Sequence, residues 1–112
     1  MAQFTNAADN TQSNLAGVTN HATGHMQTSS DAAAAYTVTL GFAPRVVRFH
    51  NVTDRISDEW FEGMASASSL HTVATGTRTL ETTNGIAVSG NTFTLTATTM
   101  VASKVFKWEA IG

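Results

Sequence analysis

Thr92–Thr98 (TFTLTAT) is the stretch of this sequence that decides the fold class. Its apolar residues, Phe93, Leu95 and Ala97, alternate with four threonines, which is the two-residue period of a strand with one buried and one polar face. Threonine is β-branched and suits a pleated surface. Because 11 of the 29 residues from 71 to 99 are threonine, we expect the polar faces of these strands to consist largely of hydroxyl groups.

The same alternation recurs on both sides of this stretch, with short turn-forming segments between the strands. Further strands are expected at residues 36–42, 45–52, 56–61, 71–81, 86–88 and 104–111. Asn84-Gly85 predicts a hairpin-type turn because this pair tolerates positive φ, and residues 63–70 are compatible with a short helix or a loose crossover. About seven short strands with almost no helix predict an all-β fold, either a small antiparallel β-sandwich or a barrel.

The first 30 residues differ in composition from the rest of the chain. They contain no Lys or Arg and few large apolar side chains, and neither a helical nor a strand period runs through them. Such a segment alone cannot bury enough surface to offset its ordering entropy. We therefore divide the chain into an extended N-terminal arm, residues 1–35, and a β-sandwich domain, residues 36–112. The arm offers backbone groups, so we expect it to bind by adding a strand to an exposed sheet edge.

Length and charge exclude several classes of protein. The chain has 112 residues, the size of one domain, and Leu, Ile, Val and Phe make up only 23 of them, so the core is modest. Six Lys and Arg against eight Asp and Glu give a net charge of −2, without the basic patch of a nucleic-acid binder. No apolar run approaches the ~20 residues that span a bilayer. We therefore expect no nucleic-acid partner and no membrane partner.

Four histidines are the first candidates for chemistry. His21 and His25 have the i, i+4 spacing that would place both on one face of a helix for a metal ion. Nothing around them favours a helix and no third ligand is near in the sequence, so we expect no metal site. His50 and His71 fall in predicted strands without an accompanying Ser or Cys motif, so neither is expected to be catalytic.

An acidic run around residue 55 is the second candidate. It consists of Asp54, Asp58, Glu59 and Glu62. A carboxylate beside an apolar group such as Trp60 could have a raised pKa and act in acid–base catalysis, as in a glycosidase. The ordinary interpretation of such a run is a polar, ion-paired face. We therefore predict no catalytic residues, no metal and no cofactor, and we do not expect an enzyme.

Arginines and scattered large apolar residues are the candidates for an interface. Arginine is favoured at interfaces because its planar guanidinium forms bidentate hydrogen bonds, whereas the large aromatic residues are expected first in the core. The arm adds apolar groups that could contact a partner. The resulting interface candidates are Phe4, Leu15, Val18, Met26, Arg45, Arg48, Arg55 and Arg78.

A family resemblance is carried by Gly41–Met64, GFAPRVVRFHNVTDRISDEWFEGM, which is similar to small virion proteins of tailed bacteriophages. The similarity continues in residues 72–80 and 84–86 and in the closing Lys107–Ala110, so it covers roughly residues 36–112. The resemblance implies a capsid decoration (cement) protein, a structural and β-rich protein that stabilises the phage head by bridging capsomers. It carries no catalytic residues over to this chain.

The resemblance also implies the partners and the location of such a protein. The partner is the major capsid protein, and the site is the outer surface of the virion capsid, reached after synthesis in the host cytoplasm. Decoration proteins cluster as trimers or dimers, and we expect a trimer rather than a dimer here. Many weak contacts repeated over a symmetric shell become effective through avidity.

A host-surface binding module, such as the tip of a tail fibre or head fibre, is the alternative function. It would present aromatic and polar side chains to a glycan. The position of the tryptophans distinguishes the two functions. Exposed Trp or Tyr on loops would favour glycan recognition, whereas burial of Trp60 and Trp108 would favour a structural scaffold.

Overall fold

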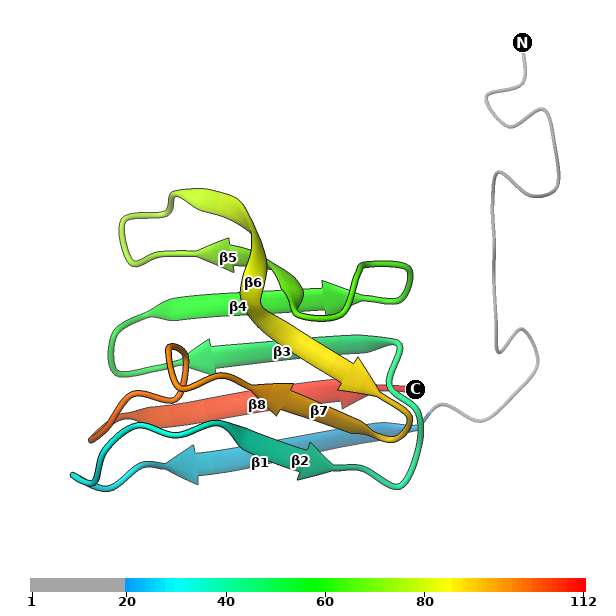
Figure 1. The fold of residues 1–112 in the computed structure, drawn as a ribbon, viewed down its shortest axis with the longest axis horizontal. Coiled ribbons are helices and arrows are strands. Elements are labelled where there is room, and N and C mark those ends of the chain that lie inside the picture. Colours follow the sequence, from blue (N-terminus) through cyan, green and yellow to red (C-terminus); the bar gives the residue numbers. More distant parts are fainter. Residues whose placement is uncertain (1–19) are drawn as a thin grey trace, which may run out of the picture.

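Residues 20–112 are the part of the chain that the structure, a computed structural model, describes, and they form eight antiparallel strands without a helix (Figure 1). The expected all-β fold is confirmed, with one strand more than predicted. The predicted interface residues Phe4, Leu15 and Val18 lie outside the described residues. The strands are β1 (His21–Gln27), β2 (Tyr36–Thr39), β3 (Val46–Asn51), β4 (Ile56–Phe61), β5 (Ser68–Thr72), β6 (Arg78–Ser89), β7 (Thr92–Leu95) and β8 (Val105–Ile111).

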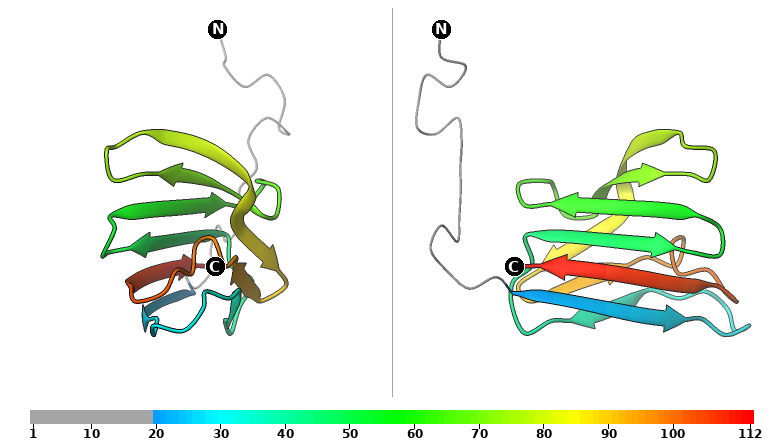
Figure 2. Two further views of the ribbon diagram at one scale, coloured as in Figure 1. Left: turned by 60° about the vertical axis from the view of Figure 1, so that its left-hand side comes forward. Right: turned by 180° about the vertical axis from the view of Figure 1, so that it is seen from behind.

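The eight strands form one sheet, in the order β1-β8-β3-β4-β5-β6-β7-β2, which curls over on itself. Figure 2 shows that β1, β8, β3 and β4 make one layer, while β7, β2 and the end of β6 lie across its other side. β6 has 12 residues and joins the two layers, since its first part pairs with β5 and its last part pairs with β7. The result is a half-barrel in which β1 and β2 are the two edge strands.

β6 bends at the position of the Asn84-Gly85 pair, so the predicted hairpin turn there is wrong. The register between β5 and β6 shifts at this point. The Glu81 carboxylate accepts hydrogen bonds from the N–H groups of Thr83 and Asn84, both at 3.0 Å, which turns the chain locally. A Cβ on Gly85 would collide with the backbone of Ser68. The turn-forming sequence therefore redirects one strand from one neighbour to another and does not reverse the chain.

β5 and β6 form a hairpin within residues 71–81, so the continuous strand predicted there is also wrong. The chain reverses between Thr72 and Arg78, with Gly76 at a φ of 94°. Gly76 is the one glycine in this threonine-rich range, so the sequence gives a weak turn signal. Residues 63–70 are compatible in sequence with a short helix or a loose crossover, but 63–67 form turns and 68–70 are the first residues of β5.

Aromatic side chains from both layers fill the space inside the half-barrel. Phe49 of β3 stacks on Phe106 of β8, with ring centroids 5.2 Å apart. Phe93 of β7 makes a T-shaped contact with Trp108 of β8 across the core, also at 5.2 Å. The alternation predicted for β3, β4, β7 and β8 is confirmed, because the inward residues that are buried include Val47, Phe49, Trp60, Phe93, Leu95, Phe106 and Ala110. Burial of large aromatic rings supplies much of the stability of so small a core.

His21–Gln27, which composition assigned to the arm, forms β1 and pairs with β8 along its whole length. The sheet therefore begins inside the predicted arm. The inward residues of β1 are Ala22, Gly24 and Met26, and Met26, predicted as an interface residue, packs against the core. A Cβ on Gly24 would collide with the indole ring of Trp108, so that ring lies directly over this glycine. Trp108 thus supplies the apolar cover that β1 itself lacks.

Gly24→Ala is expected to destabilise the protein by about 1–3 kcal/mol, the usual cost of overpacking a filled site, because the new methyl group displaces Trp108. Gly41→Ala is the matched control, since a Cβ at Gly41 meets no atom within 4 Å. Urea unfolding followed by tryptophan fluorescence measures both variants. Equal free energies of unfolding would show that the contact between Gly24 and Trp108 does not hold β1 in place.

Candidate functional site

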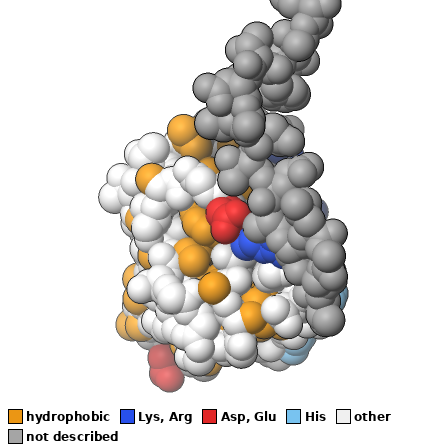
Figure 3. Space-filling view, turned by 90° about the vertical axis from the view of Figure 1, so that its right-hand side faces the viewer, with side chains coloured by type: hydrophobic (Ala, Val, Ile, Leu, Met, Phe, Trp, Pro, Cys, Tyr) orange, Lys and Arg blue, Asp and Glu red, His pale blue; other side chains and the backbone are white. Residues whose placement is uncertain are grey.

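The outer face of the layer formed by β1, β8, β3 and β4 carries a row of ion pairs. The right-hand view of Figure 2 looks onto this layer. Glu109 of β8, Arg48 of β3 and Glu59 of β4 lie opposite one another in the sheet register, so their charges alternate across the strands. By contrast, the uncovered part of the end seen in Figure 3 shows few charged side chains, with hydrophobic ones scattered over it.

Arg48 is the centre of this outer-face row. Its Nε donates to Glu59 Oε2 and its Nη1 donates to Glu109 Oε1, both at 3.1 Å. Its guanidinium carbon lies 5.8 Å from the centroid of the Phe61 ring, a cation–π contact. Arg78 of β6 extends the row, with its Nη2 4.0 Å from Glu59 Oε1. Carboxylates on both sides and an aromatic ring therefore fix the position of the Arg48 side chain.

Glu109 connects the row to β1. His21 Nε2 lies 2.8 Å from Glu109 Oε2. The hydrogen bond with His21, followed by that from Arg48, holds the pKa of Glu109 below its usual value of 4.5. Each of these ion pairs is partly exposed to solvent and adds little stability by itself. The main consequence of the row is that charged side chains from several strands hold fixed positions on one face.

The structure brings two of the four predicted interface arginines together. Arg48 and Arg78 both contact Glu59 on the outer face. Arg45 precedes β3, where its Nη2 donates to the carbonyl oxygen of the C-terminal residue at 2.6 Å. Arg55 lies in the turn between β3 and β4 with a φ of 59°. Neither Arg45 nor Arg55 belongs to the outer-face row.

The acidic run divides between the two faces of β4. Glu59 faces outward in the row, and Asp54, in the preceding turn, pairs with Lys104 at 3.1 Å. The predicted ion-paired character is therefore confirmed for these two carboxylates. Asp58 faces inward on the same side as Trp60 and is only 4% exposed. A carboxylate so deeply buried needs polar partners inside the fold.

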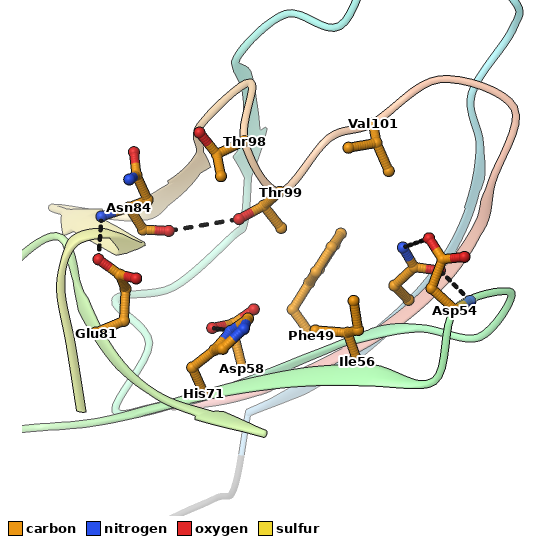
Figure 4. A pocket seen from close by; sticks show the side chains of 11 residues that line it. Phe49, Asp54, Ile56, Asp58, His71, Glu81, Asn84, Thr98, Thr99 and Val101 are labelled. Carbon is orange, nitrogen blue, oxygen red and sulfur yellow. Dashed lines mark hydrogen bonds and ion pairs between the residues drawn. The ribbon is translucent and has the colours of Figure 1, made fainter. Parts of the chain in front are cut away.

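Asp58 lines a cavity of about 160 Å³ on the inner side of the sheet, beside the bend of β6 (Figure 4). A cavity of roughly this size, about 150 Å³, holds benzene in another protein, so the space admits about one six-membered ring. Phe49, Ile56 and Val101 form its apolar part. The remaining lining residues carry polar groups, namely Asn51, Asp54, Asp58, His71, Glu81, Asn84, Thr98 and Thr99.

Asp58, Ser69 and His71 have the composition of a catalytic triad but a different connectivity. Ser69 Oγ donates to Asp58 Oδ1 at 2.7 Å, and His71 Nδ1 lies 2.9 Å from the same oxygen. In a triad the hydroxyl bonds to the imidazole, whereas here both groups bond to the carboxylate. Ser69 is also fully buried. The arrangement satisfies a buried carboxylate and orients His71 in the cavity wall, and it does not present an activated nucleophile.

Two further carboxylates line the cavity near its ends. The hydrogen bond from Lys104 is the main cause that lowers the pKa of Asp54 below its usual value. The backbone N–H groups of Asn84 and Thr83 lower the pKa of Glu81. Both carboxylates are therefore ionised at neutral pH, and they give the cavity wall hydrogen-bond acceptors.

The cavity residues were missed by sequence reasoning because they come from separate strands. Asp58 and His71 are adjacent only through the register of β4 and β5. The available signal was the position of His71 on the inward face of a strand. Because the hairpin was predicted at Asn84-Gly85 and not between Thr72 and Arg78, the strand that lies beside His71 could not be predicted.

The two histidines of β1 lie too far apart to share one metal ion. His21 and His25 both project from the outer face, and four residues along a strand span about 13 Å. Among residues 20–112, no three His, Cys, Asp or Glu side chains come together as metal ligands. Within the same range, no helix is long and apolar enough to cross a membrane.

Comparison with known proteins assigns no family to this fold and these sites. No protein-family model matches the chain, and neither a curated protein nor a solved structure is significantly similar to it. The function must therefore be inferred from the residues of this chain.

Glu109→Gln is expected to reduce the loss of stability in acid. Because the pKa of Glu109 is lowered in the folded protein, its ion pairs stabilise the fold above the usual value of 4.5, and this contribution disappears as the pH falls through the lower folded value. The melting temperature of the wild type should therefore fall more than that of the variant between about pH 6 and about pH 3.

Glu62→Gln is the control for this measurement, because the Glu62 carboxylate has no ion pair within the described range. This variant should keep the pH dependence of the wild type. Identical pH profiles for wild type and Glu109→Gln would contradict the role of Glu109 in stability.

Proposed function

We propose that this protein is a structural virion protein of a tailed bacteriophage, a capsid decoration protein that binds the outside of the head shell. Its all-β fold supports the proposal, and the motifs of residues 36–112 described in the sequence analysis are its starting point. The observation that carries it is the outer-face row, in which charged side chains are held in fixed positions around Arg48.

The outer-face row suits docking onto a protein lattice. The Arg48 side chain is 35% exposed and is already held in place by its neighbours, so it loses little conformational entropy when a partner binds. Arginines in such positions often contribute most to the binding energy of an interface. Complementary charges on a capsid protein would add specificity. Repetition over the shell would then convert modest single contacts into stable occupancy.

The tryptophan positions also support a structural scaffold over glycan recognition. Trp60 is 7% exposed, and Trp108 packs against Phe93 and over Gly24. Neither ring is presented to a ligand on a loop. Tyr36 is exposed, but it lies in the edge strand β2.

The copy number of the protein in purified phage particles tests the proposal. A decoration protein is expected in numbers comparable with the major capsid protein, distributed over the head in cryo-electron microscopy. A tail or fibre component would be present in few copies and away from the head. If purified particles contain none of the protein, the proposal is wrong.

Arg48→Gln is expected to weaken binding to heads that lack the protein by roughly tenfold, the loss typical of a central interface arginine. Arg55→Gln is the matched control, because it removes one positive charge from a turn outside the row. Quantitative co-sedimentation measures both affinities, and circular dichroism checks that both variants fold. Equal binding by the two variants would show that the outer-face row is not the docking surface.

The cavity beside Asp58 favours recognition of a host-surface glycan as a second candidate function. It combines an apolar wall containing Phe49 with converging polar groups, as small-ligand sites do. Its volume limits the ligand to about one sugar ring. On a glycan array, binding by the wild type that is lost in Asn84→Ala and kept in Glu62→Gln is the expected result for this function. No binding to any glycan would remove the second candidate and leave the first one unchanged.

A further inference from the structure

We propose that the free edge of β1 is an interface at which a second copy of this chain adds its own β1, so that two half-barrels share one continuous sheet. Among residues 20–112, β1 is the first strand in the sheet order and pairs with β8 alone. Within the described part of the chain, no strand lies on the other side of its seven residues. The proposal goes beyond the capsid function, because it concerns self-association and does not require binding to a phage head.

The backbone groups along this edge can be assigned from the hydrogen bonds that flank the strand. Gly112 N–H donates to Asn20 O, and Thr28 N–H donates to Lys104 O, so the even-numbered residues of β1 face β8. Successive residues of a strand direct their backbone groups to opposite sides. The N–H and C=O groups that point away from β8 therefore belong to four residues, which are also exposed to solvent: His21, Thr23, His25 and Gln27.

β1 lacks the features that commonly protect an edge strand. Natural edges are blunted by lysine, proline, bulges or a short length. β1 has seven residues in unbroken register with β8 and contains neither Lys nor Pro. β2, the other edge, has only four residues, and because Leu40 N–H bonds to Asn91 O, its outward groups come from Thr37 and Thr39. β1 is therefore the edge that better accommodates another strand.

β1 is self-complementary in one antiparallel register. A two-fold axis at Gly24 places Thr23 opposite His25 of the second copy, and it places His21 opposite Gln27 of the second copy. The outward backbone groups of one copy then meet those of the other as hydrogen-bonded pairs of an antiparallel ladder. Because the same strand is used on both sides, association closes at a dimer, and the proposal therefore departs from the trimer expected from the sequence resemblance.

Charges on the outer face agree with this register. Within one copy Thr23 lies opposite Glu109, and His25 lies opposite Lys107. Across the two-fold axis, four residues on adjacent strands therefore lie in one line. They are Glu109 and Thr23 of one copy, followed by His25 and Lys107 of the second copy. Alternate strands are about 9.6 Å apart, a distance that Glu109 and His25 of the second copy can bridge over the short Thr23. The outward side chains of β1 include no Lys, Arg, Asp or Glu that would place like charges opposite each other in this register.

Sedimentation velocity over a concentration series tests the proposal on the full chain. The wild type is expected to be a dimer in equilibrium with the monomer. Thr23→Pro removes an outward N–H without touching the ladder to β8, and Thr23→Lys places a charge at the same position. Each variant should raise the dimer dissociation constant at least about tenfold. Thr37→Pro makes the equivalent change on the free edge of β2 and should leave the dimer intact.

Disulfide cross-linking tests the register. The chain has no cysteine, so the double variant Thr23→Cys/His25→Cys contains the only thiols. Hydrogen-bonded antiparallel partners have Cα atoms about 5.5 Å apart, within the range of a disulfide. Oxidation should therefore give a covalent dimer, whereas the control Thr37→Cys/Thr39→Cys should give none.

Three outcomes would overturn the proposal: a wild type that is monomeric at every concentration, a trimer, or a dimer that survives both Thr23 substitutions. Binding to phage heads is measured separately on Thr23→Lys. Head binding by a wild type that is monomeric would refute the β1 interface and leave the decoration function standing. A β1-dependent dimer that binds no head would refute the decoration function and leave the β1 interface standing.

Discussion

The structure depends on one constraint: a sheet with one apolar face must cover that face, and residues 20–112 provide no helix to do so. The sheet therefore covers itself. β6 changes neighbours at its bend, and this brings β7 over the first layer, where Phe93 meets Trp108. If β6 continued straight along β5, the inward rings of β3 and β8, including Phe49 and Phe106, would face water. The Asn84-Gly85 bend thus decides whether the small set of large apolar residues becomes a core.

Alternation predicted the strands whose own side chains fill the core, and it failed where the fold depends on a neighbour. β3, β4, β7 and β8 carry large residues at every second position, so their faces were predictable from the sequence. β1 has Gly24 where an inward apolar residue is expected, because Trp108 occupies that space. The bend of β6 was placed correctly in the sequence but assigned the wrong turn type, since a local turn signal does not specify which strands lie on either side of it.

The candidate sites were also predictable from the sequence only in part. Arg48 and Arg78 were predictable as interface candidates because arginine has that preference wherever it lies. Their common partner Glu59, and the position of Glu109 opposite Arg48, follow from the strand order, which the sequence does not contain. The hydrogen bonds of Asp58 with Ser69 and His71 depend likewise on the register between β4 and β5. Interactions between side chains on different strands can be predicted only when the neighbours of each strand are known.

The composition of β1 follows from two demands made on one strand. Toward the core, the strand must leave room for the Trp108 ring, which requires glycine at its centre. Toward solvent, an edge strand needs polar side chains to remain soluble, and the pairing that we propose for β1 requires that like charges do not lie opposite each other there. Small residues inside and uncharged polar residues outside give a sequence that resembles a disordered arm. Low apolar content in such a segment is therefore compatible with an ordered strand, provided that a neighbouring strand supplies the apolar cover.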